Sequence, residues 1–131
     1  MPADLNPENP LPSPPEAASL HDLRDALRRF AAERDWDPFH TPKNLAMALS
    51  VEASELLEHF QWLTPEASKA LDATTHAAVR AEMADVLLYL VRLADRLDVD
   101  LLAAARDKMK LNANKYPVDK SRGNSRKYDR L

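Results

Sequence analysis

The chain has 131 residues, of which 45% are hydrophobic and 30% are charged, the composition of one ordinary globular domain. A single glycine against ten prolines excludes a hairpin-rich β protein and the glycine-rich loops that bind nucleotides in Rossmann and P-loop folds. The absence of cysteine excludes a disulfide framework and a thiolate metal site.

The formal net charge of −3 is unevenly distributed along the chain. From Ala103 to Leu131 there are nine Lys or Arg residues against three Asp residues, so the rest of the chain is acidic. An acidic body with a basic tail suits a small anionic ligand held between a metal ion and basic side chains, and it does not suggest a nucleic-acid binder. The alternative is that the basic tail is only a solvated surface.

The first residues lack the basic cluster and the apolar run of a signal peptide, and no segment approaches the ~18 consecutive apolar residues of a membrane helix. We therefore expect a cytoplasmic protein without a membrane partner. Residues 1–18 are rich in Pro, Ala and Glu, which predicts a disordered or loosely attached arm.

Apolar residues at helical spacing predict four helices, and hence an all-α four-helix bundle, in a domain over residues 19–116. Ser19 is a candidate N-cap for the first helix, and Thr41-Pro42 has the pattern of a second helix start. Thr64-Pro65 predicts a short extra helix. The four main helices are expected over residues 19–36, 42–62, 75–97 and 100–114. A basic tail over 117–131 follows.

Two of these helices carry paired carboxylates three residues apart within apolar rows: Glu52 with Glu55, and Glu82 with Asp85. No basic residue lies between positions 43 and 69. Carboxylates that share a cleft must be protonated, paired with bases or bound to a cation, and we prefer a divalent cation to a salt-bridged structure. Magnesium favours carboxylate oxygens and keeps waters that phosphates can replace, which indicates phosphate-ester or phosphoanhydride chemistry.

Other polar and aromatic residues continue these stripes. His59 and Trp62 follow the first carboxylate pair, and Tyr89 follows the second, at helical spacing. Near the end of the last helix Lys108, Asn112 and Tyr116 recur every four residues, so one face carries a cation, an amide and a phenol.

The loop after the first helix contains Trp36 and Phe39 between charged residues and prolines. An aromatic loop is costly unless it packs on something, so these rings either cap the core or form the wall of a base pocket.

Seven motifs suggest a family. They are FAAERDW at 30–36, FH at 39–40, PKNL at 42–45, ExxELxExFQW at 52–62, ExxDxxxYL at 82–90, KMxxNxxKYPV at 108–118 and SRGxSRKY at 121–128. Together they closely resemble the dCTP pyrophosphatases of the MazG-like all-α nucleoside triphosphate pyrophosphohydrolase superfamily. The resemblance extends from about Ser19 to Leu131. One departure is Leu27, where relatives can carry a histidine near the base.

The resemblance implies a magnesium-dependent hydrolase, with Mn²⁺ a possible substitute, that converts dCTP and 5-substituted dCTP to dCMP and pyrophosphate in nucleotide-pool sanitation. It implies that Glu52, Glu55, Glu82 and Asp85 bind the metal and serve catalysis. Seven residues would bind substrate: Trp36 and Trp62 at the cytosine, Tyr89 at the sugar, and Lys108, Asn112, Lys115 and Tyr116 at the phosphates.

The resemblance also implies a homotetramer, a dimer of dimers whose sites are completed at subunit contacts, with the tail closing a site or joining subunits. Two alternatives remain. One is a pyrophosphohydrolase for another nucleotide, such as dUTP or dITP, on the same scaffold. The other is a catalytically silent helical interaction module whose carboxylates are structural.

Overall fold

The computed structural model describes residues 17–131, so the predicted N-terminal arm lies outside the described residues except for its last two positions. All regular elements in this range are helical, which confirms the all-α class. They are α1 (Leu20–Glu33), η1 (Asp37–Phe39), α2 (Pro42–Glu58), α3 (Pro65–Ser68), α4 (Ala73–Arg96), α5 (Leu101–Lys115), α6 (Val118–Ser121) and η2 (Tyr128–Arg130). None of the helices within 17–131 combines the length and apolar character that crossing a membrane requires.

Helices α1 to α5 begin at side-chain caps. The Ser19 hydroxyl accepts a hydrogen bond from the Asp22 N–H at 3.1 Å, and the Thr41 hydroxyl accepts one from the Asn44 N–H at 3.2 Å, as predicted. Helix α4 begins two residues earlier than expected because the Asp72 carboxylate caps it, accepting from the Thr75 N–H at 2.7 Å.

Helices α1 and α2 end before the predicted residues, at Glu33 and Glu58. In α1 the cause is Asp35, whose φ of 53° is left-handed, and the Trp36 N–H then donates back to the Ala31 carbonyl at 2.9 Å. This 6→1 hydrogen bond marks a Schellman motif. Helix α4 ends in the same way at Asp98, with φ 54°. Glycine normally fills this position, so aspartate concealed the end of α1 in the sequence, whereas the end of α4 at Arg96 lies one residue from the predicted Leu97.

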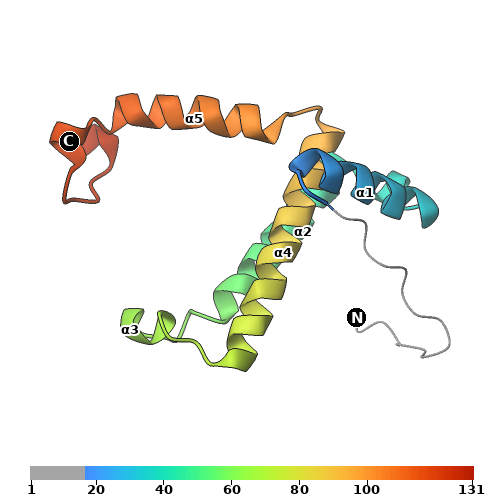
Figure 1. The fold of residues 1–131 in the computed structure, drawn as a ribbon, viewed down its shortest axis with the longest axis horizontal. Helices are drawn as coiled ribbons and strands as arrows, with labels where there is room; N and C mark the ends of the chain where they lie inside the picture. The colour runs from blue at the N-terminus through green and yellow to red at the C-terminus, as the bar shows by residue number, and fades with distance from the viewer. Residues whose placement is uncertain (1–16) are drawn as a thin grey trace.

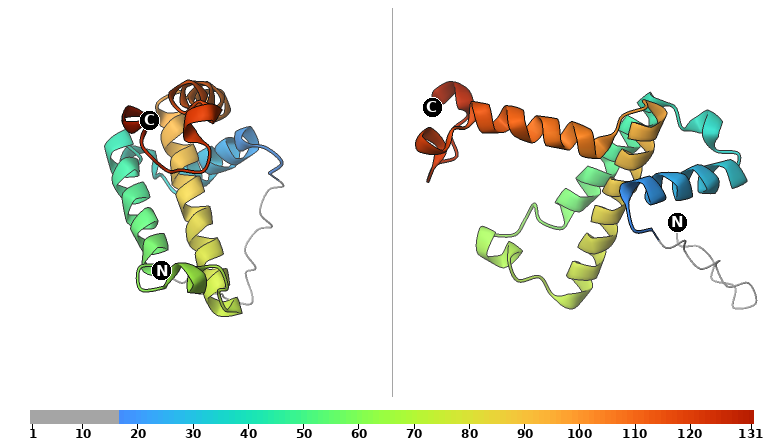
Figure 2. Two further views of the ribbon diagram at one scale, coloured as in Figure 1. Left: turned by 90° about the vertical axis from the view of Figure 1, so that its left-hand side faces the viewer. Right: turned by 45° about the horizontal axis from the view of Figure 1, so that its top comes forward.

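Helices α1, α2 and α4 pack together. Figure 1 shows α2 lying along α4 and α1 crossing the upper part of α4, and both views of Figure 2 agree. The buried apolar residues of the described chain come from all three helices: Ala31, Leu45, Val79, Val91 and Ala94. This core is small, and it fixes α2 beside α4.

Helix α5 departs from the predicted four-helix bundle. After the left-handed Asp98 and the cap at Asp100, the chain runs away from α4, and α5 stands apart from the other long helices (Figure 1). Leu101 is half-buried, but every later residue of α5 is exposed, including Met109 with 71% of its surface open. One chain therefore packs three of its four long helices.

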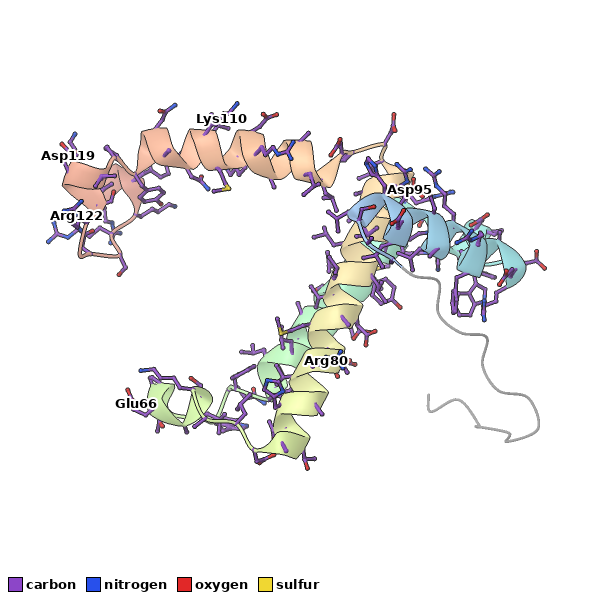
Figure 3. The ribbon with its side chains drawn as sticks, in the orientation of Figure 1. Glu66, Arg80, Asp95, Lys110, Asp119 and Arg122 are labelled. Atoms are coloured by element: carbon purple, nitrogen blue, oxygen red, sulfur yellow. The ribbon has the colours of Figure 1, made fainter. Side chains whose placement is uncertain are left out.

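The basic tail lies at the far end of α5. Figure 3 places Asp119 and Arg122 there, away from Arg80 and Asp95 on α4. The tail is partly helical, through α6 and η2, and folds back so that Tyr128 meets Tyr116 edge-on at 6.1 Å.

Candidate metal and nucleotide site

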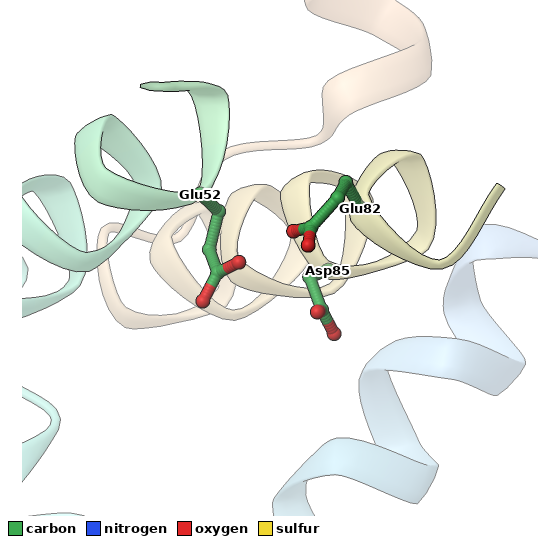
Figure 4. A group of neighbouring side chains, drawn as sticks. All are labelled: Glu52, Glu82 and Asp85. Atoms are coloured by element: carbon green, nitrogen blue, oxygen red, sulfur yellow. The ribbon is translucent and has the colours of Figure 1, made fainter. Parts of the chain in front are cut away.

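Three of the four predicted metal-binding carboxylates converge between α2 and α4. Glu52, Glu82 and Asp85 each offer one oxygen, and these oxygens all lie within 4.8 Å of one another. Figure 4 shows the Glu52 side chain from α2 reaching the space beside Glu82 and Asp85 of α4. The side-by-side packing of the two helices brings together residues about 30 positions apart in the sequence.

The fourth carboxylate, Glu55, lies one turn further along α2, beside Glu52. Burial raises the pKa of Glu52 to about 7, and Glu55, Asp85 and Glu82 contribute further to the increase. At neutral pH the Glu52 carboxyl group therefore retains a proton part of the time, because its ionised form is poorly hydrated and is repelled by its neighbours.

Two oxygens of this cluster lack partners. Glu52 Oε2 and Glu82 Oε2 are buried without a hydrogen bond within the described part of the chain. No arginine or lysine of residues 17–131 forms an ion pair with the cluster: Arg92 is engaged by Asp37 and Asp95, and Arg80 has no ion-pair partner in that range. Unpaired, closely spaced carboxylate oxygens are the ligand set of a hard divalent cation, so these residues fit one.

Tyr89 lies one turn after Asp85 on the same side of α4 and is half-buried. Burial is the main cause that raises its phenol pKa, followed by the charges of Glu52, Asp85 and Glu55. Its hydroxyl group is therefore protonated at neutral pH and can donate a hydrogen bond beside the carboxylates.

The rings of the aromatic loop differ in how they pack. Trp36 packs edge-to-face on Phe30, with ring centroids 5.7 Å apart, and lies 6.1 Å from the His40 ring, yet 42% of its surface stays open. Phe39 is largely exposed and caps no core in this chain. Trp62, in the connection between α2 and α3, is 87% exposed.

The predicted phosphate-binding residues do not join the carboxylates within one chain. Lys108, Asn112, Lys115 and Tyr116 lie on α5 or at its end, all exposed, and α5 extends away from α2 and α4 (Figure 1). At the end of α5, Lys115 Nζ lies 4.8 Å from the Tyr128 ring centroid.

Sequence reasoning missed the role of Arg92. The side chain is buried and binds Asp37, His40 and Asp95. The available signal was its spacing, three residues after Tyr89 on the helix stripe that carries Glu82 and Asp85.

The chain matches the model of the MazG-like family over residues 47–131. It is 45% identical over 115 residues to dCTP pyrophosphatase 1 of Homo sapiens and 47% identical to that of Mus musculus, covering 86% of this chain and 68% of each relative. A crystal structure of a pyrophosphatase from Archaeoglobus fulgidus superposes with a TM-score of 0.72 at 39% identity, over 78% of this chain and 95% of that one. The chain belongs to the MazG-like family.

Proposed function

We propose that the protein hydrolyses dCTP and 5-substituted dCTP to dCMP and pyrophosphate, and so serves nucleotide-pool sanitation. The observation that carries the proposal is the cluster of Glu52, Glu82 and Asp85 with its unpartnered buried oxygens. The similarity to relatives named dCTP pyrophosphatase 1 supports the choice of substrate.

In this proposal Glu52, Glu82 and Asp85, with Glu55 beside them, would hold Mg²⁺, for which Mn²⁺ could substitute. The bound ion would supply neutralisation of the triphosphate charge and polarisation of a water molecule. A carboxylate of the cluster accepts a proton from the attacking water, whose oxygen bonds to the α-phosphorus. The bond from the α-phosphorus to the α–β bridging oxygen breaks, so dCMP keeps the water oxygen and pyrophosphate leaves.

The nucleoside would be held by the aromatic residues. Trp36 and Trp62 keep open faces on which a cytosine ring can stack. Tyr89 lies one turn beyond Asp85, where its ring would pack against the sugar and leave no space for a 2′-hydroxyl group. The resemblance places Leu27 near the base at a position that can hold a histidine, so several pyrimidine bases need to be compared.

The phosphates would be bound by Lys108, Asn112, Lys115 and Tyr116 from a second copy of the chain. Two observations support this arrangement: α5 stands apart from its own carboxylates, and apolar side chains on α2, α4 and α5 are exposed, among them Met47, Val51, Met83, Leu87 and Leu111. In this proposal other copies cover these faces in a homotetramer built as a dimer of dimers. Residues 19–116 would form the pyrophosphohydrolase domain, with the 117–131 tail at a site or a subunit contact.

The test is magnesium-dependent pyrophosphate release from dCTP, 5-methyl-dCTP, dUTP, dTTP, dITP and CTP, compared by kcat/KM. We expect dCTP and its 5-methyl form to lead. Preference for dUTP or dITP would instead assign another nucleotide to the same scaffold. No release from any of the compounds would favour a silent interaction module.

Single substitutions test the carboxylates. Removing a residue that hydrogen-bonds to a metal ligand lowers metal affinity or activity by about 10- to 100-fold. Glu52→Gln and Asp85→Asn remove proposed ligands themselves, so each should lower kcat/KM by at least about 100-fold. Glu66→Gln is the matched control, because Glu66 is an exposed carboxylate on α3 that pairs with Lys69 and with no other side chain of residues 17–131. Folded Glu52→Gln and Asp85→Asn proteins with parental activity would contradict the mechanism.

A further inference from the structure

Arg92 is the sole charged residue that is buried in the described chain, with 5% of its surface exposed. Its Nε donates a hydrogen bond to His40 Nδ1 at 3.1 Å, and its Nη2 donates to Asp37 Oδ1 at 2.6 Å. Its Nη1 donates to Asp95 Oδ2 at 3.4 Å. Two of the three acceptors belong to the aromatic loop between α1 and α2.

The same network reaches α1. Arg28 donates from Nε to Asp95 Oδ2 at 2.7 Å, and a second bond joins its Nη2 to the other oxygen of Asp95. We call Arg28, Asp37, His40, Arg92 and Asp95 the Arg92 network. It ties the helix before the loop and the loop itself to one point on α4.

Arg92 lies on the same stripe of α4 as the carboxylates Glu82 and Asp85. Glu82, Asp85, Tyr89 and Arg92 follow one another on α4 at intervals of three, four and three residues, and so occupy one stripe of the helix. A rigid helix therefore carries the carboxylates at one level and the anchor of the Trp36 loop about two turns further along.

The Arg92 network orders the loop more than it stabilises the fold. A buried ion pair adds little net stability, because the desolvation of its charges offsets their attraction. Its hydrogen bonds nevertheless fix the relative positions of the groups that they join. Burial and the neighbouring Arg92 charge lower the pKa of His40, so its ring is neutral at pH 7 and Nδ1 can accept the Arg92 hydrogen bond. The His40 ring in turn lies against Trp36.

We propose that Arg92 is a positioning residue that sets the orientation of the Trp36 loop relative to the carboxylate cluster, and thereby determines base selectivity. The inference rests on the proposed function, because the contact between Trp36 and the base belongs to that function. Arg92 does not touch the substrate; it acts through Asp37 and His40.

The experiment compares Arg92→Lys and Asp37→Asn with Asp35→Asn as the matched control. Lysine keeps the charge of Arg92 but lacks the planar fork that serves three acceptors. Asp37 is half-exposed, so its substitution tests the same contact even where Arg92→Lys does not fold. Asp35 lies in the same loop without a side-chain hydrogen bond to the described residues, and asparagine tolerates its positive φ.

We expect the two network variants to raise KM for dCTP by about tenfold, because the loss of one charged hydrogen bond changes an equilibrium constant by about that factor. The value of kcat should change by less than about twofold. The preference for dCTP over dTTP should fall by a similar factor. With Trp62→Phe in the background, Trp36 is the single tryptophan, and its emission should shift in the network variants. Asp35→Asn should resemble the parent in every measurement.

Two results would overturn the inference: an equal loss for all substrates that appears in kcat, or folded network variants with parental KM and Trp36 emission. A parent without any base preference would contradict the proposed function instead. The Trp36 emission would then still decide whether Arg92 orients the loop.

Discussion

At the scale of single residues, the Glu52 carboxyl group combines burial with three acidic neighbours, which raises its pKa from 4.5 to about 7. At pH values between 4.5 and about 7, Glu52 holds a proton in the folded protein that it has released in the unfolded chain. The stability from this proton is complete below pH 4.5 and is lost as the pH rises through 7. His40, with a lowered pKa, acts in the opposite direction, because its neutral form is favoured above its unfolded pKa of 6.5.

We therefore expect the melting temperature of the parent in EDTA, measured relative to that of Glu52→Gln, to fall between pH 5 and pH 8. The comparison isolates Glu52, because His40 and all other groups are common to both proteins. Saturating Mg²⁺ should remove most of the fall, since a bound cation stabilises the ionised carboxylates. Parallel pH profiles for the two proteins would contradict the raised pKa.

At the scale of the elements, the ends of α1 and α4 depend on aspartates in the left-handed region, Asp35 and Asp98. Glycine adopts this conformation without the steric cost of a Cβ atom. Asp98→Gly should stabilise the protein by about 0.5–1 kcal/mol, and Asp98→Ala, which keeps the Cβ atom without a side chain that bonds locally, should destabilise it. Urea unfolding of the three proteins measures the order, and an alanine variant as stable as the glycine variant would contradict this account.

The same ends show what the sequence could predict at this scale. Ser19, Thr41 and Thr64 were identifiable because capping side chains leave local patterns, and a proline follows each of the two threonines. The carboxylate cluster was predictable because carboxylates within rows of apolar residues must be protonated, paired with bases or bound to a cation. The Arg92 network was not, since its loop acceptors lie 52 and 55 residues away in sequence. Only the packing of the loop on α4 makes the three side chains neighbours.

At the scale of the whole molecule, the proposed metal ligands and the proposed phosphate-binding residues of one chain lie apart. The carboxylates lie between α2 and α4, whereas Lys108, Asn112 and Tyr116 follow α5 away from them (Figure 1). Helical periodicity in the sequence could not show whether all four helices pack within one chain. An apolar helix face does not reveal whether its own chain or another copy covers it. If α5 serves a neighbouring copy, each site is shared between two chains.

Mixing two inactive proteins tests this sharing. Glu52→Gln removes a carboxylate, and Lys108→Ala removes a proposed phosphate contact, so each alone should be inactive. In a site shared between two chains, co-expression at equal amounts should restore about a quarter of the parental activity, because half of the random pairs are mixed and each has one of two sites intact. A site built within one chain would give no recovery. Each variant co-expressed with itself is the control, and recovery in the mixture alone would place α5 of one copy at the carboxylates of another.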